Sequence, residues 1–203
     1  MPAKKTGKQT STKVRQAKLT APAREEWAGI KLVATDVDGV MTDGTVLYGA
    51  QGELAKNFFI HDGMGLRLLE AAGIRVCVIT SEDSQLVHQR VSRLMLSAYK
   101  PGMKRKGEAL KSLMTSYGVI RQQTVYIGDD VNDAEALEAA GIGVCPPEAS
   151  KSARDRARYT TKAPGGRGAL REVADLILEA KGLDPVTLWR SIHPDVSSSG
   201  NKV

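Results

Sequence analysis

Aromatic residues, cysteines and long apolar runs are scarce in this chain of 203 residues. Phe, Trp and Tyr make up 4% of it, a share that favours closely packed helix-on-sheet layers over an all-β sandwich. No apolar run approaches the length of a membrane-spanning helix or a secretory signal, so we expect neither a membrane partner nor secretion. Cys77 and Cys145 lie in short apolar runs without metal-ligand spacing. They predict buried thiols in a reducing compartment, the cytoplasm.

Acidic residues are absent from residues 1–24, which hold seven of the 29 basic residues. The rest of the chain has 22 basic and 23 acidic residues, so it is close to neutral. A nucleic-acid-binding arm or a transit peptide has a similar composition, but we expect a solubilising tail and no nucleic-acid partner. Residues 1–28 are predicted to be a disordered basic tail, residues 29–182 one domain, and residues 183–203 a flexible C-terminal tail.

Apolar runs of strand length alternate with helical patterns between the two tails. Strands are predicted at 30–37, 74–80, 124–127, 142–144 and 158–161, and helices at 63–72, 83–96, 106–117, 132–140, 150–157 and 168–181. Segments 45–48 and 54–59 flank a Gly-containing turn and predict a β-hairpin. The alternation predicts an α/β fold, with a Rossmann-like parallel sheet, helices on both of its faces, and a hairpin flap after the first strand.

Carboxylates, hydroxyls and an amine follow the predicted strands. They are Asp36 and Asp38 after the first strand, Thr80 and Ser81 after the next, Asp129 after a third, and Lys106 at the start of a predicted helix. Because ligands of open parallel sheets gather at the carboxyl ends of the strands, we expect these groups on one rim. Clustered carboxylate oxygens suit Mg²⁺, and Lys106 with Thr80 can hold a phosphate beside it. The pattern predicts a phosphoryl-transfer site.

The two aspartates at the end of the first predicted strand are expected to have different roles in catalysis. Asp36 is the candidate nucleophile, which forms an aspartyl-phosphate. Asp38 is the candidate general acid for an alcohol leaving group and then the base that activates water. Taken singly, each residue has an ordinary alternative, since Asp-Gly pairs form turns and Thr, Ser or Asp cap helices. A receiver module that stores phosphate on an aspartate is another alternative, but it has no use for the second acid.

Four segments resemble the motifs of the haloacid dehalogenase-like phosphohydrolases: DVDGVMTDG (36–44), ITS (79–81), Lys106 and YIGDDVND (126–133). The likeness extends over residues 30–181. HDGMG (61–65) and APGGRGALREV (163–173) further resemble the 3-deoxy-D-manno-octulosonate 8-phosphate phosphatase family. This resemblance implies a Mg²⁺-dependent phosphatase that acts on a phosphorylated 2-keto-3-deoxy sugar acid in lipopolysaccharide biosynthesis.

The resemblance also implies roles for individual residues. By this resemblance, the metal ligands are Asp36, Asp129 and the backbone carbonyl of Asp38. Thr80 and Lys106 hold the phosphate. Asp130 and Asp133 lie behind these residues. Asp133 would orient Lys106 or a metal-bound water. Lys104 is the alternative to Lys106, but only Lys106 begins the predicted helix at the expected offset.

One departure from the family pattern concerns the substrate. Ser81 and Glu82 stand where the octulosonate enzymes usually have Gly-Arg, and Glu82 cannot pair with a sugar carboxylate as Arg does. Glu82 together with Arg93 resembles the nonulosonate 9-phosphate phosphatases and the phosphatase-like domain of sialic-acid cytidylyltransferases. The alternatives to an eight-carbon substrate are therefore a nine-carbon one, or a non-catalytic scaffold for oligomerisation.

The gaps between the motifs are too short for a cap domain. We therefore expect a neighbouring subunit to cover the site, and the resemblance implies a homotetramer with the hairpins at its centre. Gly165 and Gly166 permit close backbone approach, and Arg167 at a helix start is expected to serve a bound anion. His61 and Asp62, where the hairpin returns, are expected to contact substrate or to cap a helix.

Overall fold

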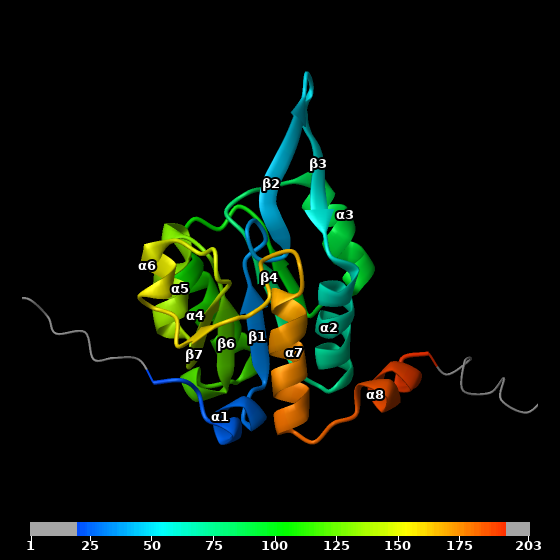
Figure 1. The fold of residues 1–203 in the computed structure, drawn as a ribbon, viewed down its shortest axis with the longest axis vertical. Coiled ribbons are helices and arrows are strands. Elements are labelled where there is room, and N and C mark those ends of the chain that lie inside the picture. Colours follow the sequence, from blue (N-terminus) through cyan, green and yellow to red (C-terminus); the bar gives the residue numbers. More distant parts are fainter. Residues whose placement is uncertain (1–19, 194–203) are drawn as a thin grey trace, which may run out of the picture.

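A six-stranded parallel sheet forms the centre of the computed structural model, which describes residues 20–193 (Figure 1). Its strand order is β5-β4-β1-β6-β7-β8. The strands are β1 (Leu32–Thr35), β4 (Arg75–Ile79), β5 (Ala98–Lys100), β6 (Thr124–Ile127), β7 (Ile142–Cys145) and β8 (Tyr159–Thr160). All five pairings are parallel. The predicted Rossmann-like sheet is thereby confirmed, with β1 in its interior between β4 and β6.

Helices cover both faces of the sheet (Figure 1). They are α1 (Arg24–Ala28), α2 (Ile60–Ala71), α3 (Gln85–Leu94), α4 (Lys106–Tyr117), α5 (Ala134–Ala139), α6 (Lys151–Arg154), α7 (Ala169–Ala180) and α8 (Pro185–Ser191). Strand β1 shows how the faces divide: Val33 packs into the core with α2, α3 and α7, whereas Leu32 and Ala34 pack with α4, α5 and α6. Because successive strand residues point to opposite faces, one apolar strand serves two cores.

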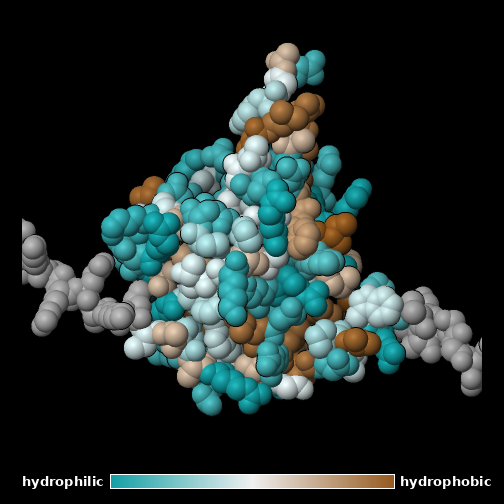
Figure 2. Space-filling model, viewed as in Figure 1, coloured by the Kyte–Doolittle hydropathy of each residue, from teal (hydrophilic) through white to brown (hydrophobic). Residues whose placement is uncertain are grey.

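A β-hairpin formed by β2 (Thr42–Gly49) and β3 (Gly52–Phe58) rises from the domain just after the first strand (Figure 1). The predicted flap is thereby confirmed. Leu47, Tyr48 and Leu54 are 57–67% exposed on it, and Figure 2 shows apolar residues on the projecting part. Only the hairpin, α2 and β4 lie between Asp38 and Thr80, so this interval holds no cap domain.

The ordered fold extends beyond the predicted domain limits at both ends. Helix α1 lies in the segment assigned to the N-terminal tail, and its Trp27 is buried against Tyr159, with the two rings edge to face. Helix α8 lies in the segment assigned to the C-terminal tail, and Leu188 and Trp189 pack against the core. The rest of the two predicted tails, residues 1–19 and 194–203, lies outside the described residues.

None of the helices in residues 20–193 combines the length and the apolar character needed to cross a membrane.

Candidate active site

A pocket of about 320 Å³ opens at the carboxyl ends of β1, β4 and β6. Its lining includes eight residues from the predicted motifs and their neighbours: Asp36, Asp38, Thr80, Ser81, Glu82, Asp129, Asp130 and Asn132. The convergence follows from parallel pairing, which brings Thr35 of β1 level with Val78 of β4 and Ile127 of β6. The structure thus brings most of the predicted site residues to one rim.

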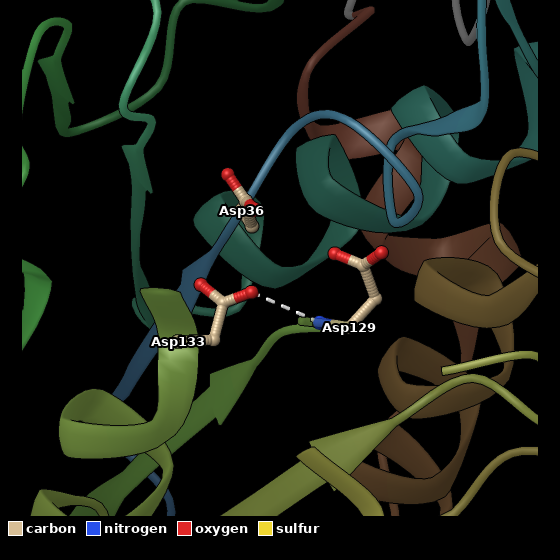
Figure 3. A group of neighbouring side chains, drawn as sticks. All are labelled: Asp36, Asp129 and Asp133. Atoms are coloured by element: carbon tan, nitrogen blue, oxygen red, sulfur yellow. Dashed lines mark hydrogen bonds between the residues drawn. The ribbon is translucent and has the colours of Figure 1, made fainter. Parts of the chain in front are cut away.

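Three carboxylates come close together at this pocket: Asp36 and Asp129, which line it, and the fully buried Asp133 (Figure 3). Asp36, Asp129 and Asp133 each place one oxygen within 4.8 Å of the others. Burial, reinforced by the charges of Asp133 and Asp130, raises the pKa of Asp129 to about 7. Burial and the charge of Asp133 also raise the pKa of Asp36, against the opposing effect of Lys106. Crowded carboxylates with raised pKa values provide a site that a divalent cation would stabilise.

Room for this cluster depends on Gly39. A Cβ atom at Gly39 would lie 2.1 Å from Asp129 Oδ2, and the residue has a positive φ of 82°. The turn after β1 can therefore approach the Asp129 carboxylate only because residue 39 has no side chain. The hard oxygen ligands gathered here fit Mg²⁺.

Lys106 lies beneath the pocket, at the first residue of α4, and is 1% exposed. Its Nζ is 2.7 Å from Asp36 Oδ2 and 2.8 Å from Asp133 Oδ1. Burial works against its positive charge, but the two carboxylates raise the pKa of Lys106 above its ordinary value. The alternative, Lys104, is exposed and lies 3.4 Å from Glu82 Oε1. The structure therefore places Lys106, not Lys104, beside Asp36.

Asp133 is completely buried and organises the groups around it. It accepts hydrogen bonds from Lys106 and, through Oδ2, from the backbone N–H groups of Asp129 and Asp130. It also accepts a hydrogen bond of 2.6 Å from the hydroxyl of Tyr126, which is 0% exposed. Tyr126 was not predicted from the sequence, although a tyrosine between Val125 and Ile127 of a buried strand is a signal that its hydroxyl needs a buried partner.

Asp38 lies at the pocket wall, where its Oδ1 accepts a hydrogen bond of 2.7 Å from Lys56 of β3. Lys56 is a second residue that the sequence analysis missed. Nothing in the hairpin sequence identifies it, because one lysine among exposed strand residues has no distinctive spacing.

Thr80, Ser81 and Glu82 line the pocket at the end of β4. Thr80 is buried, and its hydroxyl oxygen accepts a hydrogen bond from the Glu82 N–H. The Ser81 hydroxyl accepts a hydrogen bond of 3.2 Å from the Asn132 side chain, which ties the β4 loop to the β6 loop. Asp130 is exposed at the rim and accepts a hydrogen bond from the Val131 N–H. These residues offer hydroxyl, amide and carboxylate groups to a polar ligand.

Four predicted substrate residues do not line this pocket of the single chain. Asp62 is buried and caps α7, since it accepts hydrogen bonds from the N–H groups of Gly168 and Arg171. The structure thus gives it the capping role. His61 is exposed against the Phe59 ring. Arg93 lines a groove between β3 and α3. The exposed Arg167 lies 3.8 Å from Asp43, outside the pocket.

The loop before α7 packs directly on the loop after β1. A Cβ atom at Gly165 would lie 1.9 Å from the carbonyl oxygen of Gly39, and one at Gly166 would lie 2.3 Å from the Asp43 nitrogen. The Gly166 N–H also donates a hydrogen bond to the Val40 carbonyl. The predicted need for close backbone approach is thereby confirmed, and the partner is the loop that carries Asp36 and Asp38.

A parallel α/β sheet with this acidic rim, a buried lysine and a hairpin flap defines a hydrolase of the haloacid dehalogenase-like class. The family model for haloacid dehalogenase-like hydrolases matches residues 68–170. The chain is 37% identical over 163 residues to the 3-deoxy-D-manno-octulosonate 8-phosphate phosphatase KdsC of Haemophilus influenzae, covering 80% of this chain and 91% of that protein. It belongs to the family of these phosphatases.

Solved structures agree with this assignment. A structure of the 3-deoxy-D-manno-octulosonate 8-phosphate phosphatase of Moraxella catarrhalis, described as a complex with magnesium, phosphate and KDO, has a TM-score of 0.76 at 35% identity and covers 85% of this chain and 97% of that one. A putative subfamily IIIA hydrolase from Legionella pneumophila has a TM-score of 0.79 at 37% identity, covering 83% and 93%.

Proposed function

We propose that this protein is a Mg²⁺-dependent phosphatase that removes phosphate from 3-deoxy-D-manno-octulosonate 8-phosphate, in the synthesis of lipopolysaccharide. The observation that carries the proposal is the arrangement around Asp36. This buried carboxylate faces the pocket, pairs with Lys106 at 2.7 Å and lies within 4.8 Å of Asp129. The names of the related phosphatases support the choice of substrate.

The proposed reaction has two displacements at phosphorus. In the first, an oxygen of Asp36 attacks phosphorus, the bond between phosphorus and the sugar oxygen breaks, and Asp38 gives its proton to that oxygen. In the second, a water oxygen attacks phosphorus, Asp38 takes the water proton, and the bond to Asp36 breaks. Inorganic phosphate leaves, and Asp36 is again a carboxylate. Asp38 is suited to both steps because it lines the same pocket.

Lys106 and the β4 loop would hold the transferring phosphoryl group. The Lys106 ammonium group supplies positive charge next to the Asp36 oxygen, and the Thr80 hydroxyl with the Ser81 N–H would supply hydrogen-bond donors. Asp133, which accepts a hydrogen bond from Tyr126, also accepts one from Lys106 and so holds it in place. Because these donors are held in place before the substrate binds, positioning would supply much of the acceleration.

Mg²⁺ would be held by the carboxylates of Asp36 and Asp129 and by the backbone carbonyl of Asp38. These hard oxygen ligands fit it, since burial and the charges of neighbouring carboxylates raise the pKa of both Asp36 and Asp129, and a bound cation would offset that crowding of negative charge. When bound, Mg²⁺ neutralises negative charge on the phosphate and on these carboxylates. Asp133 would orient Lys106 behind them.

We further propose a homotetramer in which neighbouring subunits cover the open pocket. Three apolar residues on the hairpin, Leu47, Tyr48 and Leu54, are more than half exposed, and such a projecting apolar surface is typical of an interface. His61, Arg93 and Arg167 lie outside the pocket of their own chain, so each is available to a neighbour's site. Sedimentation should show a tetramer, and Leu47→Asp with Leu54→Asp should dissociate it. A fully active monomer would contradict this proposal.

The cytoplasm is the proposed location, because Cys77 and Cys145 are both buried free thiols.

The test of the proposed substrate is phosphate release in the presence of Mg²⁺. We would compare kcat/KM for 3-deoxy-D-manno-octulosonate 8-phosphate with that for a nonulosonate 9-phosphate. The proposal predicts a clear preference for the eight-carbon substrate, with Glu82 a tolerated variant. Preference for the nine-carbon substrate would make Glu82 a specificity residue, and inactivity with both would indicate a scaffold.

A further inference from the structure

The hairpin reaches the candidate active site through one lysine. Lys56 of β3 places Nζ 2.7 Å from Asp38 Oδ1, and its side chain is 0% exposed. It is also 3.3 Å from Glu53 Oε1, three residues earlier on the same strand. Burial lowers the pKa of Lys56, but its hydrogen bonds and charge pairing with Asp38 and Glu53 raise it above the ordinary value. A buried ammonium group is therefore shared between a hairpin carboxylate and Asp38.

The lysine is itself fixed from a third element. The Ser84 hydroxyl donates a hydrogen bond to Glu53 Oε2. Ser84 is 4% exposed and precedes α3 as its N-cap residue, yet it makes no capping hydrogen bond because its hydroxyl is directed to Glu53. Ser84, Glu53, Lys56 and Asp38 thus form a continuous chain of polar contacts from α3, through the hairpin, to the loop after β1. We call these four residues the hairpin latch.

The two buried lysines near the pocket divide the carboxylates between them. Lys106 pairs with Asp36 and Asp133, whereas Lys56 pairs with Asp38. In residues 20–193, no other side chain forms a hydrogen bond with the Asp38 carboxylate. Oδ1 of Asp38 is therefore held, and its Oδ2 has no hydrogen-bond partner in that part of the chain.

We propose that Lys56 is a positioning residue for Asp38, and that the hairpin latch uses it to aim the acid/base carboxylate at the sugar oxygen. Holding Oδ1 restricts rotation of the carboxylate and presents Oδ2 to the substrate. Proton transfer needs a donor within about 2.6–3.2 Å of the oxygen that receives the proton, and a misplacement of about 1 Å can reduce the rate about 100-fold. The inference rests on the proposed role of Asp38 as general acid.

The dependence of the rate on the leaving group separates positioning of an acid from other roles. A sugar alkoxide is a poor leaving group and needs a proton, whereas 4-nitrophenolate leaves without one. For both substrates kcat/KM includes only steps up to the first irreversible one, so hydrolysis of the aspartyl-phosphate does not obscure the comparison. Loss of a correctly placed acid should therefore slow the sugar phosphate selectively.

The experiment measures kcat/KM of the full chain for 3-deoxy-D-manno-octulosonate 8-phosphate and for 4-nitrophenyl phosphate. Lys56→Met should lower the first by about 100-fold and the second by less than about threefold, since general acid catalysis is worth about 10²–10⁴. Asp38→Asn should show the same selective loss. Lys111→Met is the matched control, because Lys111 is exposed on α4, an element that carries none of the latch residues, and its loss also removes one charge. It should leave both values unchanged.

Equal losses with both substrates, or no loss with either, in Lys56→Met would overturn the inference. If Asp38→Asn is selective and Lys56→Met is not, Lys56 has no positioning role, while the proposed acid is retained. If Asp38→Asn is not selective, the acid assignment itself fails and the inference fails with it. Should Lys56→Met not fold, Lys56→Gln is measured in its place. A selective loss of about tenfold or more supports the inference, and its absence overturns it.

Discussion

Replacing Tyr126 by Phe removes a single hydroxyl group from beneath the candidate active site. The Tyr126 side chain is 0% exposed, and its hydroxyl lies 2.6 Å from Asp133 Oδ1. Phe fills nearly the same volume, so the substitution opens no sizeable cavity. What is lost is a buried hydrogen bond to a carboxylate that also accepts from Lys106.

The expected cost follows from that hydrogen bond. A hydrogen bond to a charged group contributes about 1.5–3 kcal/mol, so we expect the free energy of unfolding to fall by about 2 kcal/mol. For a domain of this size, that corresponds to a Tm lower by about 4–8 °C. Asp133 keeps its ion pair with Lys106 and two backbone partners. We therefore expect kcat/KM to fall by less than about tenfold.

Tyr117→Phe provides the control, measured by the same urea and thermal unfolding. The Tyr117 hydroxyl donates a hydrogen bond of 2.9 Å to the carbonyl of Ser97, a neutral and partly exposed partner. Its loss should cost about 0.5–1.5 kcal/mol and leave kcat/KM unchanged. If Tyr126→Phe is no less stable than wild type, the reasoning about a buried hydrogen bond to Asp133 is refuted.

Three further predictions concern the surroundings of the pocket. Asp62→Ala should lower the free energy of unfolding by about 1–2 kcal/mol through loss of the α7 cap, with KM unchanged; a raised KM at unchanged stability would restore a substrate role. Gly165→Ala should lower kcat/KM by more than about tenfold by displacing the Gly39 loop, whereas Gly29→Ala, whose Cβ atom meets only ordinary contacts, should not. The third prediction concerns Asp129, whose pKa is raised from the ordinary 3.8 to about 7 in the folded protein. Ionisation of this carboxyl group therefore lowers the stability of the metal-free protein as the pH rises from about 4 to about 7. Mg²⁺ should raise Tm more at pH 8 than at pH 5, and an equal gain would contradict this.

The carboxyl-end residues could be predicted from sequence because their placement depends on chain direction. Asp36 and Asp129 each follow an apolar strand, and parallel strands bring their ends to one edge. Lys106 could be predicted because it begins an amphipathic segment. Such features depend on local pattern and on a topology that the alternation of strands and helices already implies.

Contacts between distant elements could not be predicted in this way. Lys56 meets Asp38 only after the hairpin folds back over the loop, and Asp62 caps a helix that begins more than 100 residues later. Helix α1 was missed because its one large apolar residue, Trp27, stands in a polar segment. Its burial depends on Tyr159, at the far edge of the sheet. The local sequence pattern around each of these residues does not indicate its distant partner.

Trapping the phosphorylated enzyme tests the central claim, that Asp36 carries the phosphoryl group. Wild-type protein and Asp36→Asn would be mixed with Mg²⁺ and substrate labelled in its phosphate, quenched in acid within milliseconds, and digested for peptide mapping. The account predicts label on the peptide containing Asp36 in the wild type, and neither label nor turnover in the variant. Label on another residue, or turnover by Asp36→Asn, would contradict it.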